Sequence, residues 1–120
     1  MRNQPKYSLF KNATYALCGL KECFMSETSF KIEIVLFVIL SITLWLIPIS
    51  LLSKIILQTS LFIPLIVELL NSAIERVVDL ACSKTHPLAK SAKDTAAAAV
   101  LLSLFLTLGI WAAVFVYELL

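Results

Sequence analysis

The sequence predicts an all-α membrane protein with three transmembrane helices and an N-terminal amphipathic helix on the membrane surface. Of the 120 residues, 60% are hydrophobic and only 15% are charged, and the mean hydropathy is +0.93. A soluble domain needs about 25% charged residues to cover its surface. The high hydrophobicity and the net charge of only +2 exclude a disordered chain, and the length suits one domain over residues 1–120.

The first element expected is an amphipathic helix over residues 7–30. Phe10, Leu17 and Phe24 recur at seven-residue intervals and therefore form one stripe on a helix, while charged residues such as Lys21 lie elsewhere around it. This pattern suits a helix in the membrane interface, with its basic residues towards the lipid phosphates. An ordinary packing helix has the same pattern, and the two interpretations are compatible.

Long uncharged stretches predict the transmembrane helices. Residues 34–52 and 95–117 contain no formal charge, and roughly 20 apolar residues cross a hydrocarbon core about 30 Å thick. The middle segment stays uncharged only over residues 55–67, which is too short, so its span must include the polar residues that follow. The three spans are expected over residues 32–52, 55–80 and 95–118.

The basic residues predict the orientation, because cytoplasmic segments of membrane proteins carry an excess of lysine and arginine. Lys54 is the only basic residue between the first and second spans. Many more precede the first span or follow the second: Arg2, Lys6, Lys11, Lys21, Lys31, Lys84, Lys90 and Lys93. The N-terminus and the loop near residues 82–93 are therefore expected in the cytoplasm, with the C-terminus outside.

The middle span carries a polar stripe. At about 100° per residue, Glu68, Asn71, Glu75 and Asp79 fall within about 80° of one another around the helix. A charged side chain in hydrocarbon costs at least about 2.5 kcal/mol on insertion scales, so such residues usually face a bundle interior or a wet cavity and have a function. The simpler alternative is that the acids, above all Asp79, pair with Arg76 and the loop lysines.

The residue types in this stripe point to phosphoryl transfer. A divalent cation relieves the repulsion between acids, and hard oxygen ligands favour magnesium or calcium over softer metals. His86, Lys90, Lys93 and Asp94 follow where the stripe reaches the cytoplasm, and lysine beside carboxylate suits a nucleotide–magnesium complex. Glu68, the deepest acid, is suited to act as general base. His86, which precedes Pro87, is equally compatible with being only a loop residue.

Residues 68–79 read E-L-L-N-S-A-I-E-R-V-V-D, and an A-K-D element at residues 92–94 and an alanine-rich third span follow. This pattern closely resembles the bacterial integral-membrane diacylglycerol kinase family, which includes undecaprenol kinases. The resemblance covers residues 15–111. It implies a homotrimer of three-span subunits in the bacterial cytoplasmic (inner) membrane, each with an interfacial helix. It also implies transfer of the γ-phosphate of ATP to a membrane lipid alcohol, at active sites shared between subunits.

The resemblance also implies roles for particular residues. The position of Glu68 matches the catalytic base, with Asn71 beside it, and Glu27 and Glu75 match the pair that holds magnesium with ATP. The matches to nucleotide contacts are Tyr15, Lys84, Thr85, His86, Lys93 and Asp94. Ala97 and Trp111 match positions that meet the lipid. Asp79 has a supporting place in the stripe, and no nucleic-acid partner is expected.

The sequence departs from the family at two positions. Ser8 stands where family members have an arginine, whose phosphate contact passes to Lys6 or Lys11 or is lost. Lys84 stands where many members have an acid, which reverses the charge beside the nucleotide.

Four functions remain to be compared. Diacylglycerol kinase is the favoured activity, and undecaprenol kinase is the alternative because residues 86–90, H-P-L-A-K, look more like that branch. A small proton-coupled transporter also uses a glutamate in the membrane, but such proteins usually have four spans and one dominant acid. A purely structural subunit leaves the polar stripe unexplained.

Overall fold

The structure is a computed structural model that describes residues 6–120. This range contains helices and no strand, and Arg2, one of the basic residues used to predict the orientation, lies outside it. The helices are α1 (Leu9–Ser26), α2 (Thr28–Leu46), α3 (Leu51–Ser60), α4 (Phe62–Ala81) and α5 (Pro87–Leu119). Three helical stretches are long and apolar enough to cross a membrane: α2, α3 with α4 over Leu51–Ala81, and α5. This agrees with the three spans predicted from the sequence.

The largest differences from the expected spans are at the end of α2 and the start of α5. Helix α2 ends at Leu46 rather than at residue 52, and Ile47 adopts an extended conformation because a helical backbone is disfavoured directly before Pro48. Helix α5 starts at Pro87 rather than at residue 95. Proline suits the first turn of a helix, and the ring Nδ1 of His86 accepts a hydrogen bond from the backbone N–H of Leu88 at 3.1 Å. Lys90 and Lys93 are therefore helical, and the loop is confined to residues 82–86.

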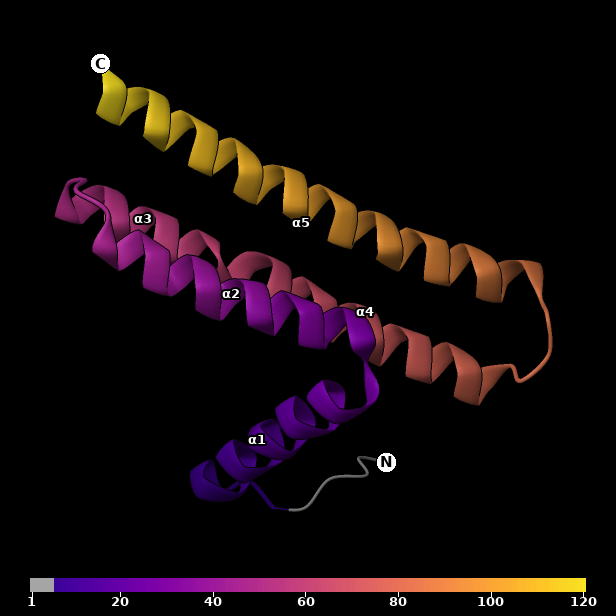
Figure 1. The fold of residues 1–120 in the computed structure, drawn as a ribbon. Coiled ribbons are helices and arrows are strands. Elements are labelled where there is room, and N and C mark those ends of the chain that lie inside the picture. Colours follow the sequence, from indigo (N-terminus) through magenta and orange to yellow (C-terminus); the bar gives the residue numbers. More distant parts are fainter. Residues whose placement is uncertain (1–5) are drawn as a thin grey trace.

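The length of α5 separates its two ends chemically. Its 33 residues extend about 50 Å at 1.5 Å per residue, which exceeds the roughly 30 Å of the hydrocarbon core. The apolar part begins at Thr95, so the first turns, which carry Lys90, Lys93 and Asp94, extend beyond it. Helix α5 packs mainly against α4, and Figure 1 shows the two running side by side from the 82–86 loop.

A proline divides the middle span into α3 and α4. Pro64 has no N–H, so the carbonyl of Ser60, four residues earlier, loses its usual helical partner. The hydroxyl of Thr107, on α5, donates to this carbonyl at 3.2 Å. Both Ser60 and Thr107 are buried. The break in the span is therefore also a point where α5 is attached to it.

Glu118 joins the C-terminal end of α5 to the N-terminal end of α3. Its Oε1 accepts hydrogen bonds from the backbone N–H of Ser50 at 3.2 Å and from the Ser50 hydroxyl at 2.6 Å. The Ser53 hydroxyl donates to the same oxygen. A carboxylate at the N-terminus of a helix interacts favourably with the helix dipole, so this contact closes the bundle at the end opposite the 82–86 loop.

Helix α1 lies at an angle to the three spans and contacts only α2 and α4 among the described helices (Figure 1). Its buried residue is Cys23, whose Sγ donates to the Ser72 hydroxyl at 3.6 Å. The predicted apolar stripe faces away from the rest of the chain, since Phe10, Leu17 and Phe24 are 85%, 66% and 39% exposed. The chain itself leaves this stripe uncovered.

The contact at the proline break predicts a result for a double-mutant cycle. Thr107→Val is expected to lower the unfolding free energy by about 0.5–1 kcal/mol, because the Ser60 carbonyl loses its donor. In a Pro64→Ala background the same substitution is expected to have almost no effect, because the introduced alanine supplies the missing N–H. Reversible unfolding in detergent measures both values, and equal effects in the two backgrounds contradict this account of the break.

Candidate functional site

The polar stripe of α4 passes from a buried end to an exposed end. Glu68 and Asn71 are 5% and 8% exposed, Glu75 is half-buried, and Asp79 is exposed. The four residues lie on one helix at spacings that keep them on one face. Their burial therefore falls steadily towards the 82–86 loop.

The buried end of the stripe is a carboxylate with one protein donor. The hydroxyl of Ser29, in the first turn of α2, donates to Glu68 Oε1 at 2.8 Å. Phe30, which follows Ser29, and Leu65, one turn before Glu68 on α4, are buried in the same small core as Cys23. Burying a carboxylate without several hydrogen bonds is unfavourable, so Glu68 is available to interact with a polar group of another molecule.

Asn71 has an unused acceptor beside this carboxylate. Its Nδ2 donates to Glu75 Oε1 at 3.3 Å. Its Oδ1 is buried and has no hydrogen-bond partner among the described residues. Such orphaned atoms are uncommon in folded proteins, and this one provides an oxygen ligand or acceptor next to Glu75.

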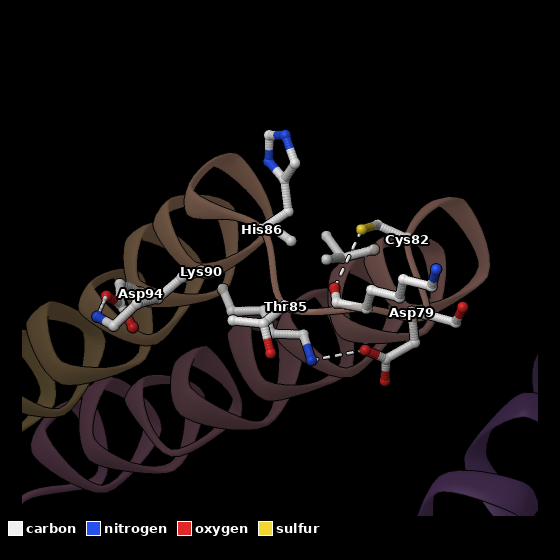
Figure 2. Close-up of a pocket in the computed structure, with 11 residues that line it drawn as sticks. Asp79, Cys82, Thr85, His86, Lys90 and Asp94 are labelled. Carbon is white, nitrogen blue, oxygen red and sulfur yellow. Dashed lines mark hydrogen bonds and ion pairs between the residues drawn. The ribbon is translucent and has the colours of Figure 1, made fainter.

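A basic pocket of about 330 Å³ lies at the exposed end of the stripe, between the end of α4 and the start of α5. Figure 2 shows the side chains that surround it. It is lined by Val78, Asp79, Cys82, Ser83, Lys84, Thr85, His86, Ala89, Lys90, Lys93 and Asp94. Three lysines against two aspartates give this lining a formal charge of +1, which favours an anion. The pocket thus brings together Asp79 and five of the residues predicted to contact a nucleotide.

The charged side chains of this pocket are paired. Lys93 Nζ lies 2.6 Å from Asp79 Oδ1, and Lys90 Nζ lies 2.5 Å from Asp94 Oδ2 (Figure 2). The pairing of Asp79 with Lys93 agrees with the simpler interpretation of Asp79, in which an acid near a helix end pairs with a lysine. All four side chains are well exposed, so each pair contributes little to stability and separates easily when an anion binds.

Two other predicted residues lie outside this pocket. Tyr15 is on α1 and is 52% exposed, and Glu27 occupies the extended junction between α1 and α2. Helix α1 does not contact α5, so the fold of this chain does not bring Tyr15 to Lys93. No group of three or more potential metal-ligating residues occurs in residues 6–120.

The two residues predicted to meet lipid are both on α5, in different environments. Ala97 is exposed. Trp111 is half-buried, and its indole N–H donates to the Ser60 hydroxyl at 2.9 Å. The ring of Trp111 therefore lies beside the break between α3 and α4.

The sequence did not single out Glu33 on α2, a second acid that faces the interior of the helix bundle. Its Oε2 is buried without a partner among the described residues. It lines an otherwise largely apolar cavity of about 210 Å³ together with residues of α2, α4 and α5, including Pro64 and Thr107. A signal was present, because Glu33 is an acid at the edge of a long apolar run, but helical periodicity within one segment does not reveal which helix it faces.

These features define a class: an integral membrane protein with a buried carboxylate inside its bundle and a pocket with a net positive lining at the polar end of the same helix. Comparison with known proteins gives the family. Residues 14–115 match the family model described as prokaryotic diacylglycerol kinase.

Three similar proteins carry the name diacylglycerol kinase. The one from Helicobacter pylori (strain ATCC 700392 / 26695) is 40% identical over 108 residues, which cover 86% of this chain and 80% of the relative. The one from Escherichia coli K12 is 35% identical over 104 residues (86% and 84%), and the one from Pseudomonas aeruginosa is 38% identical over 104 residues (86% and 85%). The chain belongs to the prokaryotic diacylglycerol kinase family.

The hydrogen bond to Glu68 predicts a stability change. Ser29→Ala is expected to lower the unfolding free energy by about 1–3 kcal/mol, because the buried carboxylate loses its donor. Thr43→Ala, on the same helix, is the control, because its exposed hydroxyl bonds only to the Ile39 carbonyl of its own helix. Unfolding in a denaturing detergent compares the two, and equal losses contradict the assigned role of Ser29.

Proposed function

We propose that this protein is an ATP-dependent lipid kinase that converts diacylglycerol to phosphatidic acid at the cytoplasmic face of the bacterial inner membrane. The observation that carries the proposal is the burial of Glu68, at 5% exposure, on a stripe that leads to a basic pocket. Membership of a kinase family supplies the context, since a kinase uses a phosphoryl donor such as ATP, and the relatives are named for the diacylglycerol reaction.

The proposed working form is a homotrimer with cytoplasmic N-termini. The distribution of basic residues supports this orientation. The exposed stripe of Phe10, Leu17 and Phe24 supports an interfacial position for α1, because an uncovered apolar face is otherwise exposed to water. Helix α1, which carries Tyr15, does not contact α5 beside the pocket, and this supports active sites that are completed by a neighbouring subunit.

On the lipid side, the hydroxyl of diacylglycerol is proposed to reach Glu68 from the bilayer. Ser29 is the only donor to Glu68 among residues 6–120, and the second oxygen of Glu68 is proposed to accept a hydrogen bond from this hydroxyl. Asn71 lies one turn further along α4 and orients the reacting groups through its unpaired carbonyl. Ala97 and Trp111 are proposed to contact the rest of the lipid.

On the nucleotide side, the phosphates are proposed to bind at the 330 Å³ pocket. Lys93 and Lys84 provide ammonium groups, and Thr85, His86 and Asp94 provide polar atoms around the nucleotide. Binding exchanges the ion pair of Lys93 with Asp79 for one with phosphate. This exchange is inexpensive, because both side chains are exposed to water.

Magnesium is proposed to bind through Glu27 and Glu75. The residues fit such an ion, because magnesium is usually held by one or two carboxylates and by phosphate oxygens rather than by a complete protein cage. The unpaired Asn71 Oδ1 beside Glu75 adds an oxygen of the required type. When bound, the ion offsets negative charge on the phosphates.

The proposed transfer begins when Glu68 accepts the proton of the lipid hydroxyl. The hydroxyl oxygen bonds to the γ-phosphorus as the bond from that phosphorus to the bridging oxygen of ADP breaks, so the products are phosphatidic acid and ADP. Lys93 offsets the charge that accumulates on the transferring group. The apolar surroundings of Glu68 keep water, the competing acceptor, away from the reaction.

The lipid specificity predicts the outcome of a direct comparison. Purified protein in lipid nanodiscs with radiolabelled ATP and Mg²⁺ is expected to phosphorylate diacylglycerol with a higher kcat/KM than undecaprenol. Chelation of Mg²⁺ with EDTA is expected to stop the transfer.

A higher kcat/KM for undecaprenol establishes the alternative that residues 86–90 favour. Absence of label in either lipid, with a folded protein, contradicts the proposed function. ATP consumption that depends on neither lipid nor Mg²⁺ also contradicts the proposed function.

A further inference from the structure

Arg76 connects α4 to the end of α1 through several contacts. Its Nη2 donates to the Ser26 hydroxyl at 3.0 Å. The guanidinium also lies 3.6 Å from Glu22 Oε1 and 3.9 Å from Glu27 Oε1. Arg76 directly follows Glu75 in sequence, so one cation lies against both segments that carry the proposed metal ligands.

Glu27 is held only loosely in this cluster. Its side chain is 28% exposed, and its separation from Arg76 exceeds a hydrogen-bond distance. Among residues 6–120, Arg76 is the only basic residue that forms an ion pair with Glu27. The carboxylate is therefore neutralised without being fixed by a hydrogen bond, which leaves its oxygens available to a stronger ligand.

We propose that Arg76 is a built-in counter-cation for Glu27, which a divalent metal must displace when it binds. This inference rests on the proposed role of Glu27 as a metal ligand. A metal ion carries twice the charge of the guanidinium and contacts carboxylate oxygens directly at about 2.0–2.1 Å for magnesium, so it prevails over a cation at 3.9 Å.

Glu22 and Ser26 give the displaced guanidinium a place to remain. Glu22 is 70% exposed, and it approaches Arg76 more closely than Glu27 does. The Ser26 hydroxyl also accepts from Arg76 while donating to the Glu22 carbonyl at 2.7 Å. Arg76 can therefore release Glu27 and still hold α1 against α4. Glu22 and Ser26 are positioning residues in this arrangement, since they act on Glu27 through Arg76.

This arrangement predicts that Arg76 weakens metal binding, which is the opposite of what a purely structural link predicts. Arg76→Gln removes the charge and keeps a hydrogen-bond donor, so Mn²⁺ affinity is expected to rise about two- to fivefold, as for the loss of one partly exposed ion pair. Arg76→Lys keeps the charge and is expected to change the affinity little. Glu22→Gln leaves the guanidinium with Glu27 and is expected to weaken Mn²⁺ binding.

Mn²⁺ binding to the full-length protein in nanodiscs, measured by electron paramagnetic resonance without substrates, tests this inference apart from activity. Circular dichroism of each variant establishes that it is folded. Weaker or unchanged binding in folded Arg76→Gln overturns the inference, because Arg76 then acts as a structural link or not at all.

Glu27→Gln separates this inference from the proposed function. Loss of Mn²⁺ binding in Glu27→Gln with unchanged binding in Arg76→Gln overturns only the role of Arg76. Unchanged binding in Glu27→Gln overturns both the role of Arg76 and the assignment of Glu27 as a ligand, while lipid phosphorylation by the wild-type protein still tests the kinase activity by itself.

Discussion

The burial of Glu68 in a helix that crosses the membrane is the constraint on which the rest of the arrangement depends. A carboxylate there is unfavourable unless other groups compensate for its lost hydration. Among residues 6–120, Ser29 is the only donor to this carboxylate, and the buried Asn71 Oδ1 and Glu33 Oε2 have no hydrogen-bond partner. The proposed function assigns this unmet hydrogen-bonding capacity of Glu68 to the substrate, because a lipid hydroxyl can donate to the carboxylate.

Breaks in the helices determine where this carboxylate meets the solvent-exposed groups. The extended junction at Glu27 separates α1 from α2, so α2 begins at Thr28. Ser29, in the first turn of α2, then faces Glu68 on α4. Pro64 frees a carbonyl that Thr107 satisfies, which attaches α5 to the middle span. Pro87 begins α5 early enough for its first turns to form one wall of the basic pocket. These three breaks therefore place α2 and α5 beside α4, where their side chains meet the polar stripe and the basic pocket.

The sequence was sufficient to predict features that depend on one segment at a time. The number of spans followed from length and hydropathy, and the common face of Glu68, Asn71 and Glu75 followed from the helical repeat. The contacts of Trp111 with Ser60 and of Arg76 with α1 did not follow, because they depend on how separate helices pack. The uncharged stretch predicts too late a start for α5, since it begins eight residues after the helix does.

The central claim is that Glu68 removes the proton of the lipid hydroxyl, and a single-turnover measurement with Glu68→Gln tests it most directly. Glutamine retains an acceptor for Ser29 and avoids a buried charge, so the variant is expected to fold and to assemble like the wild type. Its rate of phosphate transfer from ATP to diacylglycerol is expected to fall by about 10²–10⁴-fold, whereas Glu118→Gln, at the opposite end of the bundle, keeps the wild-type rate. A folded Glu68→Gln protein that transfers phosphate at the wild-type rate contradicts the account.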